Sequence, residues 1–151
     1  MALNFEKYAQ EGSHFVNNLA KDLGHPEEKA RTGIVLRSVL HAIRERLTVS
    51  ESLHILSQLP MFLKSIYVDN WKYREKPLGL NTTEDLLKEV ENYQEQYGES
   101  DFDWNKTTAE IVQIVLRALG AFISEGEFRH IIAQMPEQLA EFLSKSLTGK
   151  K

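Results

Sequence analysis

Apolar residues recur along the chain mostly at steps of three and four, and strict alternation of apolar and polar residues is rare. The three- and four-residue step is typical of amphipathic helices, whereas alternation is typical of strands. The 4 prolines and 8 glycines among the 151 residues leave long stretches uninterrupted. The pattern therefore predicts an all-α protein.

The first third of the chain predicts two long helices. One runs from about Leu3 to Leu23, and Gly24 is a natural residue to end it. Pro26 suits the first turn of the next helix, which continues to about Leu47 and is apolar around much of its circumference. We expect this second helix in the middle of the core. The first helix has one stripe that is expected to be buried, made of Phe5, Tyr8, Phe15, Leu19 and Leu23.

Two shorter helices follow, each with a signal for its start. Thr48 to Glu51 fits a capping box, in which the Thr hydroxyl bonds a free backbone N–H and the Glu bonds back to the N-cap residue. The helix that it opens is expected to reach about Gln58. Pro60 then suits the first turn of a fourth helix.

A connector and four further helices account for the rest of the chain. Residues 68–80 show no period, and we expect Trp71 and Tyr73 to hold this connector to the surface. The next two helices are expected to end near Gly98 and Phe122. Three capping boxes and one proline open the helices of this half: Asn81–Glu84, Thr107–Glu110, Ser124–Glu127 and Pro136.

Two stretches of the first half return in the second. Residues 34–37 read IVLR, and so do residues 114–117, at an offset of 80. Residues 54–60 read HILSQLP and residues 130–136 read HIIAQMP, at an offset of 76. The second copy thus lacks four residues, which is close to one helical turn, so that a helix can shorten and largely keep its facing.

This repetition predicts an internal duplication of a four-helix unit, with copies at about residues 3–70 and 81–147. A unit of about 65 to 75 residues would be marginally stable alone. We therefore expect an internally duplicated bundle of about eight helices. Its two repeats would pack around an approximate two-fold axis and share one core, so that residues 1–151 form a single domain.

Composition narrows the classes of function. The chain has no cysteine, which excludes a disulfide framework, a cysteine-bound zinc and a thiol nucleophile. Its 22 acidic and 18 basic residues give a net charge of -4, which disfavours binding to a phosphate backbone. No apolar run reaches the roughly 18 residues of a membrane span, and the first residues lack the pattern of a signal peptide. We expect a cytoplasmic protein with neither a nucleic-acid nor a membrane partner.

Three motifs follow one another in the first half: a Leu-Arg pair in a central helix, a Gln-Leu-Pro segment after a short helix, and an aromatic stretch ending near a Trp. They occur at Leu36-Arg37, Gln58-Leu59-Pro60 and Tyr67 to Trp71. The second copy, Leu116-Arg117 and Gln134-Met135-Pro136, is weaker, because Met135 replaces the Leu and the aromatic stretch is absent. In this set the chain resembles, over most of residues 5–147, the bacterial family of domain of unknown function 2267. The resemblance implies an all-helical bacterial protein without an established activity, and it supplies no catalytic or binding residues.

The sharpest candidate for chemistry is a pair of Glu-x-x-His sequences, Glu51 with His54 and Glu127 with His130. In di-iron helical bundles this spacing places a carboxylate and an imidazole on one helix face toward a metal. Each Glu also falls at the last position of a capping box, and the central helices contribute arginines rather than inward glutamates. We therefore favour caps beside partly exposed histidines, and we expect no metal and no cofactor.

Two glutamines and two arginines are the candidates for binding a ligand. Gln58 and Gln134 either extend the polar stripe of their histidines or bond backbone groups left open where proline interrupts the helix. Arg37 and Arg117 lie in largely apolar helices, where a buried guanidinium needs a carboxylate or several carbonyl partners. The alternative is that both arginines converge near the pseudo-two-fold axis and bind an anionic ligand.

Patterns of known catalysis are missing from the sequence. It contains no glycine-rich phosphate loop, and its 5 histidines show no His-x-x-x-His zinc pattern. The sequence therefore predicts a non-enzymatic helical module that binds a partner protein or assembles with itself. The alternative is a metal- or anionic-ligand-binding protein that uses the Glu-x-x-His pairs or the two arginines.

Overall fold

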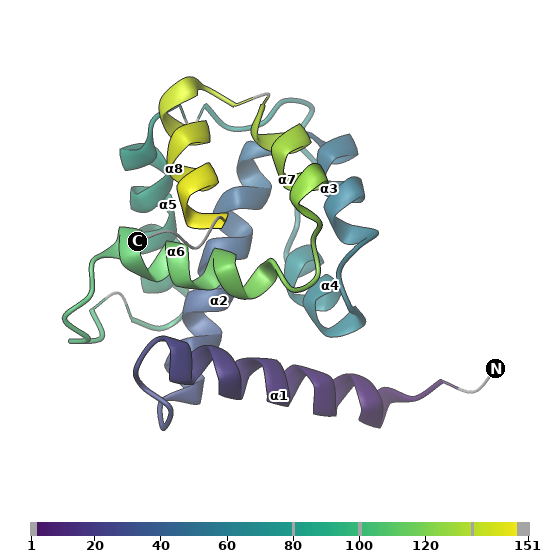
Figure 1. Ribbon diagram of the computed structural model, residues 1–151, viewed down its shortest axis with the longest axis vertical. Coiled ribbons are helices and arrows are strands. Elements are labelled where there is room, and N and C mark those ends of the chain that lie inside the picture. The colour runs from purple at the N-terminus through teal and green to yellow at the C-terminus, as the bar shows by residue number, and fades with distance from the viewer. Residues whose placement is uncertain (1–2, 80, 100, 134, 148–151) are drawn as a thin grey trace.

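The structure, a computed structural model, describes residues 3–79, 81–99, 101–133 and 135–147. These residues form eight helices and no strand, which confirms the all-α prediction. Figure 1 shows the helices α1 (Phe5–Asp22), α2 (Lys29–Arg46), α3 (Val49–Leu56), α4 (Met61–Val68), α5 (Thr83–Tyr97), α6 (Thr108–Leu119), α7 (Glu125–Ile132) and α8 (Glu137–Leu147).

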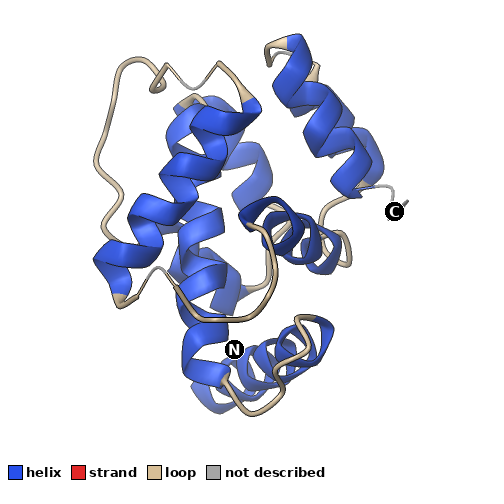
Figure 2. Cartoon of the chain, turned by 90° about the vertical axis from the view of Figure 1, so that its left-hand side faces the viewer, coloured by secondary structure: helices blue, strands red, loops and turns tan. Residues whose placement is uncertain are grey.

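Helix α2 runs through the middle of the molecule and packs against α1, α4, α5 and α6 (Figures 1 and 2). Its apolar residues point in several directions, so that neighbours on different sides can cover them. Each aliphatic side chain that is buried in this way contributes about 1.5–3 kcal/mol to stability. One continuous cluster of buried apolar side chains includes members of all eight helices.

The helices of the second half follow the order of the first, but the central one is shorter. Helix α2 has 18 residues and α6 has 12. The missing residues fall between the repeated arginine and the next N-cap, Thr48 in the first half and Ser124 in the second. The duplication itself stays a prediction, which this order of elements supports.

Two of the four predicted capping boxes are present as predicted, at Thr48 and Thr107. The box at Asn81 is one residue out of register, because Thr82 is the N-cap of α5. The Thr82 hydroxyl accepts from the Asp85 N–H at 3.1 Å, and the Asp85 carboxylate accepts from the Thr82 N–H at 3.3 Å. The fourth box, at Ser124, is half formed, because the Ser124 hydroxyl accepts from the Glu127 N–H but the Glu127 carboxylate does not bond back.

Two helix ends also differ from the prediction. Gly24, with φ 83°, ends α1 as expected, but Pro26 lies in the following turn and α2 begins only at Lys29. The reason is a turn that the Glu28 N–H closes on the His25 carbonyl at 3.0 Å. Helix α6 ends at Leu119 rather than near Phe122, because residues 120–122 tighten into turns with i to i+3 hydrogen bonds.

The predicted stripe of α1 is buried over only part of its length. Phe15, Leu19 and Leu23 are buried, but Phe5 is 69% exposed. Figure 1 shows why: α1 lies across one end of the molecule, and its N-terminal part projects beyond α4. Spacing predicted which face of the helix is apolar, but no helix that the structure describes covers that face at the projecting end.

The connector is held by polar contacts as well as by aromatic ones. Trp71 packs edge-on against Tyr67, with ring centroids 5.7 Å apart, whereas Tyr73 is 77% exposed and does not hold the connector as predicted. Glu45 of α2 holds it instead. Its carboxylate pairs with Arg74 at 2.9 Å, and its backbone carbonyl accepts from the Leu78 N–H at 2.9 Å.

No helix in the described part of the chain is both long enough and apolar enough to cross a membrane.

Candidate functional site

The two Glu-x-x-His pairs meet where α3 and α7 lie side by side, a region called here the α3–α7 junction (Figure 1). The rings of His54 and His130 are 6.4 Å apart between centroids. The Glu127 carboxylate lies 3.9 Å from Nδ1 of His54. Three of the four predicted side chains therefore gather in one place.

The fourth, Glu51, is used elsewhere. One of its carboxylate oxygens accepts from the Thr48 N–H at 2.8 Å, as the capping box requires. Within the described ranges, no three His, Asp or Glu side chains are arranged so as to hold a metal ion. The junction places two imidazoles and one carboxylate near each other, but not in an arrangement that would hold a metal ion.

Gln58 links the two halves at this junction. Its side-chain oxygen accepts from the Ser124 N–H, the N-cap of α7, at 3.0 Å. The Ser124 hydroxyl accepts from the Glu127 N–H at 3.2 Å, but Gln58 occupies the N–H to which Glu127 would bond in a complete box. The predicted repeat of the capping box is therefore wrong at this end, and Glu127 Oε2 is buried without a hydrogen bond to any described residue. Gln134 lies outside the described residues.

The two repeated arginines have different surroundings. The Arg37 guanidinium bonds the Asp69 carboxylate at 2.6 Å and lies 4.0 Å from the centre of the Tyr97 ring. Arg117 is half-buried, and its Nε makes no hydrogen bond to a described residue. Arg37 thus has the carboxylate partner that the structural interpretation requires.

A buried polar network on α2 was missed by sequence reasoning. Arg44, only 2% exposed, donates to the backbone carbonyls of Tyr67 and Asp69 at 2.7 and 2.8 Å. Glu45 accepts from the Tyr93 hydroxyl at 3.0 Å as well as from the connector. The available signal was the spacing of Arg37, His41, Arg44 and Glu45, which shares one helix face at i, i+4, i+7 and i+8.

His41 lies at the centre of this network and is fully buried. Its Nε2 is 2.7 Å from the Ile66 carbonyl, which can only accept, so Nε2 carries the proton and Nδ1 accepts from the Tyr97 hydroxyl at 2.6 Å. Burial, together with the positive charges of Arg44 and Arg37, lowers the pKa of His41 to about 4. The imidazole is therefore neutral at physiological pH.

The network stabilises the fold and does not form a binding site. Burial raises the pKa of Tyr67 to about 12, and its hydroxyl lies 2.6 Å from that of Ser52. Burial also raises the pKa of Tyr93. The cavity beside Arg44 and Glu45 measures about 10 Å³, which is at the limit for a single water molecule. These groups fasten the end of α4 and the connector to α2 and leave no room for a substrate.

An open groove of about 370 Å³ lies between α1, α4 and α6. Its floor is a cluster of three rings, Phe15, Phe62 and Phe122, with centroids 5.5 to 6.2 Å apart. The other residues that line this α1 groove are Glu11, His14, Asn18, Leu19, Asp22, Ala118 and Ala121. The groove thus has an apolar floor and a polar rim.

Comparison with known protein families shows to which family the chain belongs. Residues 12–144 match the family described as "Uncharacterized conserved protein (DUF2267)". The chain belongs to this family. The DUF2267 match includes the residues that line the α1 groove apart from Glu11, and it includes the whole α3–α7 junction, whereas the projecting end of α1 precedes it. No curated protein matches the chain, and the DUF2267 description assigns no activity.

Proposed function

We propose that this chain is a non-enzymatic self-association module, in which the projecting end of α1 from one copy binds in the α1 groove of another. The observation that carries the proposal is that one chain has both parts. Leu3 and Phe5 on the projecting end are 75% and 69% exposed, and the groove floor is a partly open cluster of three phenylalanines. Exposed aromatic side chains and aromatic-lined pockets are typical anchors of protein interfaces.

The charges around these two parts are mixed. The projecting end carries both Glu6 and Lys7 next to Phe5 in the sequence, and Glu11 and Asp22 lie on the rim of the groove. Only Lys7 can pair with the rim carboxylates, so apolar contacts would supply most of the binding.

Because each copy has both parts, two copies with antiparallel α1 helices would exchange them in a closed, two-fold symmetric dimer. Two Phe5 and two Leu3 side chains would be buried, at about 1.5–3 kcal/mol each. Association costs about 4–15 kcal/mol in lost translational and rotational freedom. The balance predicts a weak dimer whose population depends on protein concentration.

Sedimentation velocity over a range of concentrations tests the proposal. We expect wild type to dimerise as concentration rises and Phe5→Glu to stay monomeric, because a carboxylate cannot enter the apolar groove. Tyr73→Glu is the matched control, since it changes an aromatic residue of similar exposure in the connector. It should behave as wild type.

A second variant blocks the other part. Ala121→Arg adds a long charged side chain at an exposed position on the groove and should also prevent dimerisation. A mixture of Phe5→Glu and Ala121→Arg should recover some dimer, because it retains one intact end and one intact groove. A wild type that stays monomeric at every concentration, or a dimer that Phe5→Glu leaves unchanged, would overturn the proposal.

The second candidate is transition-metal binding at the α3–α7 junction. The meeting of His54 and His130 and the unpaired oxygen of Glu127 support it. The use of Glu51 in a cap counts against it, as does the lack of a metal-holding group of three such side chains among the described residues. Elemental analysis of the untagged protein, followed by a zinc titration, separates the outcomes. Stoichiometric metal that disappears in a His54→Ala, His130→Ala double variant would favour this function, and protein that neither contains nor binds metal would remove it.

A further inference from the structure

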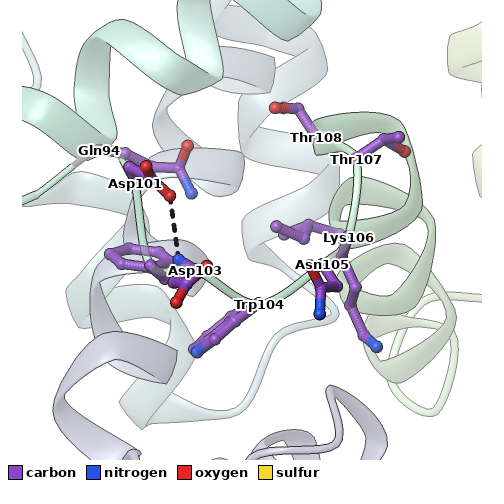
Figure 3. Close-up of a pocket in the computed structure, with 10 residues that line it drawn as sticks. Gln94, Asp101, Asp103, Trp104, Asn105, Lys106, Thr107 and Thr108 are labelled. Carbon is purple, nitrogen blue, oxygen red and sulfur yellow. Dashed lines mark hydrogen bonds between the residues drawn. The ribbon is translucent and has the colours of Figure 1, made fainter.

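A second cavity, of about 390 Å³, lies between the end of α5, the following loop and the start of α6 (Figure 3). It is separate from the α1 groove and shares no lining residue with it. Most of its lining is polar, and the side chains used below are Gln94, Asp101, Asp103, Asn105 and Thr108.

Gln94 is the unusual member of this set. It is only 2% exposed, yet its carboxamide forms no hydrogen bond with any residue that the structure describes. Its amide atoms are nevertheless not among the described side-chain atoms that are both enclosed and without a partner. In Figure 3 the carboxamide lies beside Asp101 and faces the open space, across which lies the Thr108 hydroxyl. The contents of the cavity are therefore in position to bond this amide.

The charge that faces this partner is negative. Asp101 uses one carboxylate oxygen to accept from the Asp103 N–H at 2.9 Å, and the Asp103 carboxylate has no hydrogen bond within the described residues. Among the described lining residues Lys106 is the basic one, and it directs its amine away from Gln94, toward Gly24 at the end of α1 (Figure 3). Thr108 donates its hydroxyl hydrogen to Glu91 at 2.6 Å, which leaves its oxygen free to accept.

The loop resembles a cation-binding loop only in part. Asp101, Asp103 and Asn105 have the i, i+2, i+4 spacing of the first three ligands in calcium-binding helix–loop–helix sites. Such loops continue with a glycine at the sixth position and a glutamate at the twelfth, where this chain has Lys106 and Val112. The loop therefore lacks the ligands needed to replace the whole hydration shell of a cation.

We propose that this cavity binds a hydrated divalent cation. Asp101 and Asp103 supply the charge, and the oxygens of Gln94 and Thr108 accept hydrogen bonds from the water molecules of the cation. Magnesium fits this description, because it retains several waters and is held by one or two carboxylates. Six waters at about 30 Å³ each occupy about 180 Å³, and the cavity of about 390 Å³ accommodates them.

Isothermal titration of the full chain with MgCl₂ at constant ionic strength, after treatment with EDTA and its removal, tests the proposal. The NMR signal of the Gln94 side-chain NH₂ serves as a second, local readout. We expect one cation per chain and a shift of this signal. An Asp101→Asn, Asp103→Asn double variant should bind at least tenfold more weakly. A Glu6→Gln, Glu75→Gln double variant, which removes two exposed carboxylates elsewhere, should bind as wild type.

A gain-of-function variant guards against loss of fold. Gln94→Glu adds a third carboxylate to the cavity and should tighten magnesium binding. Absence of heat and of any NMR shift at millimolar MgCl₂ would show that water alone fills the cavity and would overturn the proposal. Binding that persists in the Asp101, Asp103 double variant would place the cation elsewhere, and a response to CaCl₂ but not to MgCl₂ would contradict a cation that keeps its waters.

Discussion

The neutral, buried imidazole of His41 makes the stability of this fold dependent on pH. Its pKa lies near 4 in the folded chain, and an unperturbed histidine has 6.5. Between these values the unfolded chain binds a proton at this residue and the folded chain does not, so acidification favours unfolding. One pKa unit corresponds to about 1.4 kcal/mol, so His41 removes at most about 3 kcal/mol of stability as the pH falls from about 7 to about 4.

Urea denaturation across this pH range measures the effect. We expect His41→Gln to be less stable than wild type near neutral pH but to lose less stability on acidification. His14→Gln is the control, because His14 is exposed and its substitution should leave the pH dependence unchanged. Equal pH dependence in His41→Gln and wild type would contradict the assignment.

The polar face of α2 could be predicted from the sequence, but its burial could not. The spacing of His41, Arg44 and Glu45 was visible in the sequence, but their burial depends on acceptors and donors from other elements. The carbonyls of Ile66 and Tyr67 become available only because α4 ends beside α2. A helix pattern predicts which residues share a face, and tertiary packing decides whether charged residues on that face are solvated or enclosed.

A substitution at Gln58 measures how much its hydrogen bond to the start of α7 contributes to stability. Gln58→Ala removes the acceptor of the Ser124 N–H, and loss of a cap hydrogen bond costs about 1 kcal/mol. Ser65→Ala is the control, because its exposed hydroxyl bonds, within the described part of the chain, only the Phe62 carbonyl of its own helix. We expect a lower free energy of unfolding in urea for Gln58→Ala and almost no change for Ser65→Ala. If both variants match wild type, the contact contributes nothing to stability.

The helices themselves were predictable because their signals are local. Periodicity and caps such as Thr48 and Thr107 depend on neighbours within a turn or two. The boundary at α5 was misplaced because Asn81-Thr-Thr-Glu84 and Thr82-Thr-Glu-Asp85 both read as caps, and the sequence alone does not choose between them. The incomplete box at Ser124 depends on Gln58, 66 residues away, which no local pattern reports. The meeting of the two Glu-x-x-His pairs was likewise left open by the sequence.

The shared core predicts that neither half of the chain folds alone. Helices α2 and α5 pack extensively across the two halves, and every helix contributes to the same apolar cluster. An isolated fragment of residues 1–79 would expose the face of α2 that α5 covers. We expect this fragment to show little helix by circular dichroism and no cooperative thermal transition.

Mixing it with a fragment of residues 81–151 provides the control. If the shared core is what each half lacks, the mixture should gain helix content and unfold cooperatively. Cooperative unfolding of the 1–79 fragment by itself would show that the first half is an independent domain and would contradict the prediction of a single one.

Phe5 lies outside the residues that match DUF2267, and this bears on how related chains in one cell would pair. The groove lies almost wholly within the matched residues 12–144, whereas the end of α1 that is proposed to fill it precedes them. Under the proposed dimer, related chains would share the groove of the matched fold. Residues 1–11 would then determine which groove each chain binds. Exchange of those few residues would then reassign which chains pair, while the core and its stability stayed the same. A variant that lacks residues 1–11 would still bind the projecting end of another copy in its groove, but it could not insert an end of its own. It would therefore act as a competitive inhibitor of pairing.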